Sequence, residues 1–450
     1  MGDRRKVLEL FEEQKVFLSE RVESGIEKHR KGDAVISIFD KNGNPVPNAR
    51  IKITQKNHEF RFGANLFMLD ELETDDKNEK YKQYFADIFN MATLPFYWNT
   101  LEPEKGKPRY AKDSAKIYRR PPIDLCIEYC KNHGIEPREH ALAYDAFFPT
   151  WLCSASIDEV KSEFERRCAE ISERYADKIP TIEVTNEMEW PSCKTAFYND
   201  PDYIKWCFEA ARKYFPKNQL GINEHTQLAW VDCCRATDKY YAYIEANLLR
   251  GAPIDAIGMQ YHIFRRAEDE YRTTRTLYNP KQLYAHMDMY ARFGKPLQIT
   301  EITVPSYSWE EEDEEIQAKI IEALYSIWFS HPAVEQIIYW NLVDGYAHVA
   351  DADPQKIKET QGNMSVGENY FHGGLLRFDM TPKPAYIKIK ELLQKRWHTE
   401  EDLVSDENGN ASFRGFYGDY DVEIVAKGKV MSKQISLSKK QDNLFIVTIL

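Results

Sequence analysis

Two glutamates occur in the same kind of segment in distant parts of the chain. Residues 179–187 run Ile-Pro-Thr-Ile-Glu-Val-Thr-Asn-Glu, an apolar, β-branched segment that ends in Asn186 and Glu187. Residues 297–304 run Leu-Gln-Ile-Thr-Glu-Ile-Thr-Val and carry Glu301 near their end. Such segments are typical of buried strands, whose interiors accommodate carboxyl groups poorly. Two carboxyl groups at strand ends, one protonated and one ionised, could together cleave a glycosidic bond.

Around these glutamates, segments typical of strands alternate with segments typical of helices. The expected strands are residues 60–67, 91–98, 137–144, 179–187, 220–226, 256–262, 297–302 and 334–342. The expected helices include residues 158–175, 202–214, 237–250, 280–293, 312–330 and 383–395. Eight such repeats in roughly 330 residues predict a (β/α)8 TIM barrel. A doubly wound sheet would also alternate, but the chain has no G-x-G-x-x-G or G-x-x-x-x-G-K motif to support one.

Active groups of a barrel belong at the carboxyl ends of its strands. The expected ends carry Asn65, Trp98, His140, Tyr144, Asn186, Glu187, Asn223, Glu224, Gln260, His262, Glu301, Trp340 and Asp344. This set is polar and aromatic, whereas the strand interiors are apolar. A purely structural barrel would have little reason to gather it, so the pattern favours an active site at this end.

The two ends of the chain have a different pattern. Residues 1–31 place apolar side chains at three- and four-residue steps among charges, which predicts an amphipathic helix packed on a larger body. Alternating strands with Asn-Gly or Pro-rich turns are expected near residues 34–54 and after residue 405. Neither group has enough strands to bury a core alone. We therefore expect one small β-sandwich from residues 32–57 and 400–450, resembling the carboxypeptidase-regulatory type, with a barrel of residues 58–399 inserted.

The composition argues against several kinds of partner. A formal net charge of −12 disfavours nucleic acid or an anionic membrane as the main partner. No apolar run approaches the ~20 residues of a membrane span, and no apolar signal core follows the first residues. We expect a cytoplasmic protein, or an extracellular one if a signal was removed. The eight cysteines form no C-x-x-C pair and no zinc-type spacing, which indicates reduced thiols and no metal or other cofactor.

Several motifs resemble glycoside hydrolase family 10, the β-xylanases, which belong to the large clan of retaining TIM-barrel glycosidases. The motifs are Thr-Asn-Glu at 185–187, Ile-Thr-Glu at 299–301, Gly-Ile-Glu-Pro-Arg-Glu-His at 134–140, Pro-Thr-Trp at 149–151, Gly-Ile-Asn-Glu at 221–224, Ile-Asp-Ala-Ile-Gly-Met-Gln-Tyr-His at 254–262, Tyr-Trp-Asn-Leu-Val-Asp at 339–344 and Pro-Lys-Pro-Ala-Tyr at 382–386. This ordered series spans residues 58–396. One Asn-Glu pair would be weak support, but the series is specific.

The resemblance implies a role for each matched residue. Glu187 would act as general acid and then general base, and Glu301 would be the nucleophile of a double displacement. Asn186 would hydrogen-bond the sugar 2-hydroxyl, and His262 would hold Glu301 ionised and oriented. The residues expected to bind the sugar are His140, Asn186, Gln260, His262, Trp340, Trp98 and Tyr144. The expected partner is a polysaccharide or oligosaccharide.

The chain departs from the family's pattern in three places. Residues 92–99 read Ala-Thr-Leu-Pro-Phe-Tyr-Trp-Asn, which keeps Trp98 but lacks the family's Glu-Asn pair and lysine. After His140 the family's usual Trp and second His are missing, and Thr303 replaces an Asp after the nucleophile. Because a site built to hydrogen-bond one hydroxyl discriminates strongly, these changes predict an altered sugar preference more than a loss of cleavage.

The alternatives fall into different classes. The chain could be a β-glucanase or another β-glycosidase of the same clan. It could also be a carbohydrate-binding protein on a degenerate barrel, against which the presence of both glutamates argues. A metal-dependent hydrolase lacks ligand-spaced residues. His133 and His286 are expected on helix surfaces, and the acidic run at 310–315 as the solvated start of a helix.

Overall fold

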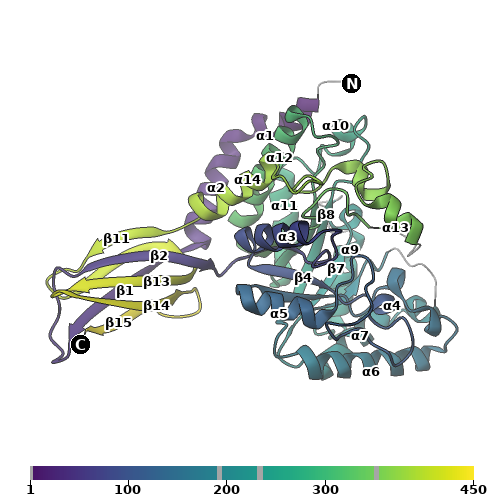
Figure 1. The fold of residues 1–450 in the computed structure, drawn as a ribbon, viewed down its shortest axis with the longest axis horizontal. Helices are drawn as coiled ribbons and strands as arrows, with labels where there is room; N and C mark the ends of the chain where they lie inside the picture. Colours follow the sequence, from purple (N-terminus) through teal and green to yellow (C-terminus); the bar gives the residue numbers. More distant parts are fainter. Residues whose placement is uncertain (1–3, 190–194, 231–236, 349–353, 450) are drawn as a thin grey trace.

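The computed structural model describes residues 4–189, 195–230, 237–348 and 354–449. Its centre is a closed barrel of eight parallel strands in the order β10-β3-β4-β5-β6-β7-β8-β9 (Figure 1). The strands are β3 (Arg61–Asn65), β4 (Met91–Pro95), β5 (Glu136–His140), β6 (Thr181–Asn186), β7 (Gln219–Glu224), β8 (Ala256–His262), β9 (Leu297–Thr303) and β10 (Val334–Tyr339). The predicted TIM barrel is confirmed.

Helices follow the strands and cover the outside of the barrel. The longer ones are α3 (Asp75–Ile88), α5 (Ile123–His133), α6 (Ile157–Tyr175), α7 (Tyr203–Tyr214), α9 (Lys239–Leu249), α11 (Pro280–Tyr290), α12 (Glu311–Ser330) and α14 (Pro384–Glu391). Short helices are α4 (Trp98–Leu101), α8 (Thr226–Ala229), α10 (Glu270–Thr273) and α13 (Pro354–Thr360). Side chains at the first residue before α3, α6, α9 and α11 accept hydrogen bonds from free N–H groups of the first turn, which fixes where these helices begin.

Six of the eight barrel strands end one to four residues earlier than the sequence predicts, and two of these ends change the position of a predicted site residue. The expected strand over residues 91–98 ends at Pro95, and Trp98 begins α4 instead. Proline has no N–H group to continue a strand ladder, which explains the end of β4. The expected strand over residues 137–144 ends at His140, so Tyr144 lies in the loop that follows β5.

A β-sandwich built from both chain ends lies beside the barrel (Figure 1). Its sheets have the orders β12-β1-β15 and β11-β2-β13-β14. The strands are β1 (Lys31–Asp40), β2 (Arg50–His58), β11 (Glu400–Val404), β12 (Asn410–Phe416), β13 (Gly418–Ala426), β14 (Lys429–Leu437) and β15 (Leu444–Ile449). Burial alternates along β2 and β13, and Ile51, Ile53, Val422 and Ile424 join one buried cluster. The expected split sandwich is present.

The N-terminal segment packs on the barrel, as its pattern predicts. It forms α1 (Glu9–Glu13) and α2 (Lys15–His29), and α2 contacts α12. Arg30, directly after α2, donates to the carbonyl oxygens of Phe329, His331 and Val334 near the end of α12. One prediction about a helix is wrong: His286 on α11 is 1% exposed, because its ring packs against Trp230 inside the barrel wall.

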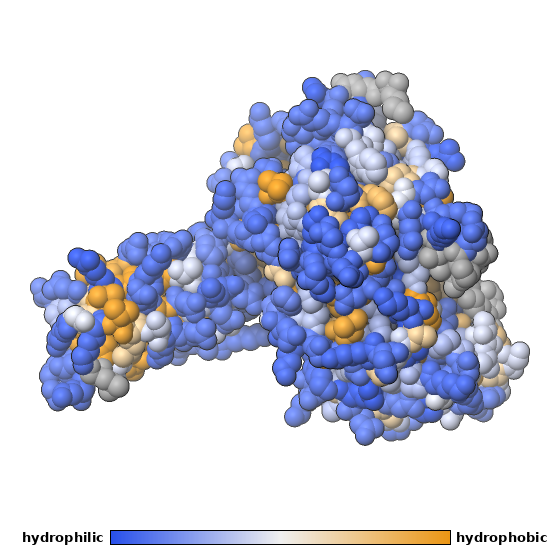
Figure 2. Space-filling model, viewed as in Figure 1, coloured by the Kyte–Doolittle hydropathy of each residue, from blue (hydrophilic) through white to orange (hydrophobic). Residues whose placement is uncertain are grey.

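The five described cysteines carry free thiols, whereas Cys193, Cys233 and Cys234 lie outside the described residues. Among the described residues, every helix is too short or too polar to span a bilayer. On the face shown in Figure 2, the barrel surface is mainly hydrophilic, and apolar side chains gather on the outer part of the sandwich. Exposed apolar residues of the sandwich include Val404, Val430, Leu444 and Ile446.

Deletion of residues 400–450 tests whether the two chain ends fold together. It removes β11 to β15 and leaves β1 and β2 without their partners in the described sheets. We expect the shortened chain to aggregate or to melt about 5–10 °C lower, because unpaired apolar edges are exposed. Thermal unfolding by circular dichroism, with light scattering, measures this. An unchanged melting temperature would show that the ends are independent.

Candidate active site

The two predicted catalytic glutamates lie at the carboxyl ends of β6 and β9. Glu187 directly follows β6, and its backbone has a φ of 50°, in the left-handed region that non-glycine residues seldom adopt. Such backbone strain is typical of functional sites. Glu301 lies within β9 and is 3% exposed. The barrel therefore brings together two carboxyl groups that are more than a hundred residues apart in the chain.

One amide joins the two carboxyl groups. Gln260 Nε2, from β8, lies 3.0 Å from Glu187 Oε1 and 3.0 Å from Glu301 Oε1. These two oxygens therefore cannot be farther apart than twice that distance. Retaining glycosidases hold their two carboxyl groups about 5–5.5 Å apart, whereas inverting enzymes separate them by about 6.5–9.5 Å. The shared donor thus holds these two oxygens closer together than the separation typical of inverting enzymes.

Further hydrogen bonds fix each carboxyl group. Tyr144 Oη donates to Glu187 Oε2 at 2.5 Å. Asn223 Nδ2, from β7, donates to Glu301 Oε1 at 3.1 Å and to Asn186 Oδ1 at 2.9 Å. Since the carbonyl oxygen of the Asn186 side chain is engaged in this way, its amino group is the part that can donate to a sugar hydroxyl.

The partners of His140 favour its protonated form. Its Nδ1 lies 2.8 Å from Glu183 Oε1, and its Nε2 lies 2.9 Å from Tyr97 Oη. Burial lowers the pKa of His140, but the charge and hydrogen bond of Glu183, together with the charge of Glu301, outweigh burial and raise the pKa above the ordinary value. Arg138 pairs with the other oxygen of Glu183. Burial raises the pKa of Glu183, and the charges of Arg138 and His140 reverse this and lower it. The group is a buried ion-pair network whose charges act on Glu301.

The expected role of His262 needs a correction. Its Nε2 lies 3.2 Å from Glu301 Oε2 and its Nδ1 lies 2.9 Å from Thr303 Oγ1, so it orients the carboxyl group. However, burial lowers the pKa of His262 to about 4, so the ring is neutral near pH 7. Burial also raises the pKa of Glu301 well above its ordinary value, and the charge of His140 opposes this. His140, not His262, therefore favours the ionised form of Glu301.

Trp340 and Trp98 have different positions. Trp340 follows β10 and packs edge-on against His140 and His262, with ring centroids 5.5 and 5.8 Å away, so it borders the catalytic pair as expected. Trp98 is buried on α4, where it packs against Phe148 and Phe164 and donates to Glu102. The structure therefore places Trp98 in the core and not with the other predicted site residues.

Several residues of the site, among them Glu183, Tyr97 and Asn223, have no role in the sequence-based prediction. Glu183 and Tyr97 connect to His140, and Asn223 connects to Glu301. Glu183 could have been recognised as a charged residue within the apolar segment 179–187, since buried carboxyl groups are rare without partners. Asn223 was predicted to lie at a strand end, but no role was predicted for it. Tyr97 could not be found, because its contact depends on the end of β4 at Pro95.

Among the described residues, one group is close enough to hold a metal ion. The possible ligand atoms of His140, Glu183 and Glu301 lie within 4.8 Å of one another. In this arrangement His140 already bonds Glu183, and Arg138 occupies the other Glu183 oxygen. The negative charge of Glu183 is thus balanced by Arg138 and by its hydrogen bond with His140. This arrangement suits a protonated histidine better than a metal ion.

The charge of His140 can be tested through the pH dependence of the reaction. Replacement of His140 by glutamine removes a positive charge near Glu301, so the pKa of Glu301 is expected to rise. More alkaline solution is then needed to ionise Glu301, and the acidic limb of kcat/KM should move up by about one pH unit. Tyr97→Phe is the control, because it removes a hydrogen bond to His140 but keeps the charge. An unmoved limb in His140→Gln would contradict the assignment.

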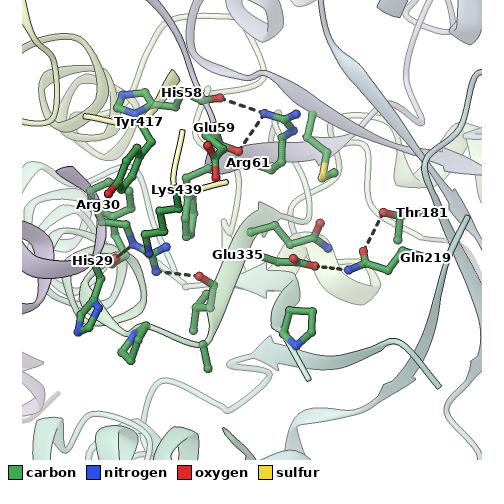
Figure 3. Close-up of a pocket in the computed structure, with 18 of the residues that line it drawn as sticks. His29, Arg30, His58, Glu59, Arg61, Thr181, Gln219, Glu335, Tyr417 and Lys439 are labelled. Carbon is green, nitrogen blue, oxygen red and sulfur yellow. Dashed lines mark hydrogen bonds between the residues drawn. The ribbon is translucent and has the colours of Figure 1, made fainter. Parts of the chain in front are cut away.

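A separate cavity of about 720 Å³ lies at the opposite end of the barrel. It is lined by the amino ends of barrel strands and by the sandwich residues Tyr417 and Lys439 (Figure 3). There Gln219 Nε2 donates to Glu335 Oε1 at 2.9 Å, and Thr181 Oγ1 donates to Gln219 at 3.2 Å. This cavity contains neither Glu187 nor Glu301.

A closed (β/α)8 barrel with two bridged carboxyl groups at its strand ends has the architecture of a glycoside hydrolase. The chain belongs to glycosyl hydrolase family 10, whose family model matches residues 56–391. The resemblance seen in the sequence motifs is thereby confirmed.

The following relatives are distant in sequence, and the similar solved structures share the fold. Endo-1,4-beta-xylanase 1 of Arabidopsis thaliana is 23% identical over 432 residues, which cover 94% of this chain and 39% of the relative. The chain spans less than half the length of the first curated relatives that it matches. Native xylanase 10B from Thermotoga maritima has a TM-score of 0.59 and 21% identity, covering 75% of this chain and 96% of that structure. Xylanase 10B from Thermotoga petrophila RKU-1, solved with xylobiose, has a TM-score of 0.58 and 20% identity, covering 75% and 95%.

Proposed function

We propose that this chain is a retaining glycosidase that cleaves β-1,4-xylosidic bonds in xylan or xylo-oligosaccharides. The observation that carries the proposal is the single Gln260 amide that bridges Glu187 and Glu301. A site that binds sugar without cleaving it does not require two carboxyl groups in this arrangement. Membership of family 10 and the xylanase relatives support xylose as the sugar.

In the first step Glu187 donates its proton to the glycosidic oxygen as the bond to the anomeric carbon breaks. Glu301 attacks that carbon and forms a covalent glycosyl-enzyme intermediate. Burial raises the pKa of Glu301, and the charge of His140 opposes this and favours the carboxylate form that a nucleophile needs.

In the second step Glu187, now ionised, takes a proton from water. The resulting hydroxide equivalent attacks the anomeric carbon, and Glu301 leaves as a carboxylate. Two inversions give net retention. The free amino group of Asn186 is suited to hydrogen-bond the sugar 2-hydroxyl, an interaction that strengthens in the transition state.

The second strand bears on the choice of sugar. Tyr97 directly precedes Trp98 and occupies the position of the family's lysine. Unlike lysine, it brings no positive charge to the site. Its hydroxyl engages His140. A changed set of hydroxyl-binding groups favours a second candidate, a β-glucanase or another β-glycosidase with the same two-glutamate mechanism.

A digest separates these candidates. Xylan, xylo-oligosaccharides, mixed-linkage glucan and cello-oligosaccharides are incubated with the protein, and products are resolved by chromatography and mass spectrometry. Release of short xylo-oligomers supports the proposal. Products from glucosides alone would show that the substrate is a glucoside and would leave the proposed mechanism unchanged. Binding to these sugars without any product would favour the carbohydrate-binding alternative.

A further inference from the structure

The cavity at the amino ends of the barrel strands lies between the barrel and the sandwich (Figure 3). Its volume of about 720 Å³ falls within the range of about 300–1,000 Å³ that small-molecule sites occupy, and such sites often lie between domains. Lys439 and Lys440 of the sandwich line this cavity and are exposed, so it opens to solvent beside them. A small molecule can therefore enter it from solution.

A fixed carboxyl group lies on the barrel side of this cavity. Glu335 Oε1 accepts hydrogen bonds from Gln219 Nε2 at 2.9 Å and from Gln298 Nε2 at 2.7 Å. In the described part of the chain, nothing donates to the second oxygen, Oε2, and no cation forms an ion pair with the group. Burial raises the pKa of Glu335. An acceptor that is held in this way gains stability from a donor that enters the cavity.

An aromatic ring lies on the sandwich side. Tyr417 is half-buried, and its backbone N–H donates to the carbonyl of Arg30 at 3.0 Å. A Cβ atom at Gly32 would lie 2.6 Å from Tyr417 Cε1, so the ring lies directly against the backbone of β1. The ring is thus held in place as an apolar surface in a cavity that also contains polar groups. A sugar ring, which has an apolar C–H face, can pack on such a surface.

The charges that line the cavity are mixed in sign. Lys439 and Lys440 line it with amino groups that form no ion pair within the described ranges. Burial and the charge of Arg30 lower the pKa of Lys439, and the charge of Glu59 opposes this. A small cation would be repelled by these basic groups, and a small anion by Glu335. Hydroxyl groups both donate and accept hydrogen bonds, so a neutral molecule that carries several of them suits both kinds of group.

We propose that this cavity is a binding site for a neutral saccharide of one or two rings, separate from the catalytic site. Its hydroxyl groups donate to Glu335 Oε2 and accept from Lys439, and one ring packs on Tyr417. The cavity lies at the opposite end of the barrel from Glu187 and Glu301, so the inference does not depend on the proposed glycosidase function. It gives the sandwich a role, since Tyr417 and Lys439 complete a site that the barrel alone forms only in part.

Lysine acetylation measures occupation of this site directly. The Glu301→Gln variant, used to prevent turnover, is treated with a trace of an N-hydroxysuccinimide acetate ester, and mass spectrometry gives the acetylation rate of each lysine. Xylobiose or cellobiose should slow the reaction of Lys439 in a saturable way, by about threefold when two thirds of the sites are occupied. Lys433, an exposed lysine on β14 of the same sandwich, does not line the cavity and should react at an unchanged rate.

Two further variants remove one contact from each side of the site. Glu335→Met takes away the acceptor on the barrel, and Tyr417→Ala takes away the ring on the sandwich. Each should abolish the protection of Lys439 by sugar. Because the two changes lie in different domains, the unfolding of one domain cannot explain both results. Tyr271→Ala is the matched control, since Tyr271 is an exposed tyrosine on α10 outside the cavity, and this variant should keep the protection.

The outcomes also separate this inference from the proposed function. Protection of Lys439 supports the saccharide site even if the wild-type protein hydrolyses no sugar. An unchanged rate at Lys439 with both disaccharides would overturn the proposal, as would protection that survives in both Glu335→Met and Tyr417→Ala. Inorganic phosphate and glycine are tested in parallel. Protection by either of these, without protection by a sugar, would assign the cavity to a charged ligand and would also overturn the proposal.

Discussion

Replacement of Glu301 by glutamine should lower kcat on xylo-oligosaccharides by about 10⁴-fold or more, because the variant has no nucleophile to form the glycosyl-enzyme. Glutamine has nearly the same shape and can keep hydrogen bonds to Asn223 and His262. Sugar binding should therefore survive while turnover collapses. Steady-state kinetics and calorimetry on the same variant measure the two quantities separately.

Glu335→Gln is the matched control for this prediction. Glu335 is a carboxyl group of the same barrel, on β10, but it lines the cavity at the opposite end and bonds Gln298 and Gln219. The same chemical change there should leave kcat within a few fold of the wild type. Undiminished turnover in Glu301→Gln would remove Glu301 from the mechanism.

Replacement of Glu187 by alanine should have an effect that depends on the leaving group. Turnover of xylo-oligosaccharides should fall by about 10²–10⁴-fold, since their leaving oxygen needs a proton. In an aryl xyloside with an acidic phenol, the phenolate leaves without protonation. Formation of the glycosyl-enzyme from this substrate should therefore be nearly unaffected. Added azide should then restore turnover, because it attacks the glycosyl-enzyme without a general base and gives a β-glycosyl azide.

Glu189→Ala controls for the neighbouring carboxyl group. Glu189 lies two residues beyond Glu187, and it interacts with Tyr243 and Lys239 instead of the catalytic pair. This variant should keep normal kinetics on every substrate and should not respond to azide. If Glu189→Ala, and not Glu187→Ala, showed azide rescue, the acid/base would have been misassigned.

The fold was largely predictable because its elements follow simple periodicities. Apolar segments that end in polar residues gave the barrel strands, and alternation around Asn-Gly turns gave the sandwich. The predicted strand of residues 256–262 is β8 as observed. The errors occurred where local chemistry competes with the pattern: β4 stops at Pro95, which moves Trp98 from a strand end onto a helix in the core.

The charges of the site could not be predicted from residue types. His140 and His262 lie at equivalent strand ends, and nothing in the sequence tells which is protonated. The difference arises from partners: Glu183 faces His140, whereas His262 has Thr303 at one nitrogen and Glu301 at the other. Likewise, the contact between the Arg120 guanidinium and the ring of Tyr97 depends on the fold and could not be predicted from the sequence.

The most direct test of the account is to trap the covalent intermediate. A 2-deoxy-2-fluoro-xylobioside with a good leaving group should inactivate the protein, because the fluorine slows hydrolysis of the glycosyl-enzyme more than its formation. Digestion and mass spectrometry then locate the sugar. The account predicts a single label on the peptide that contains Glu301. A label on another carboxyl group would contradict the assignment of the nucleophile and with it the mechanism.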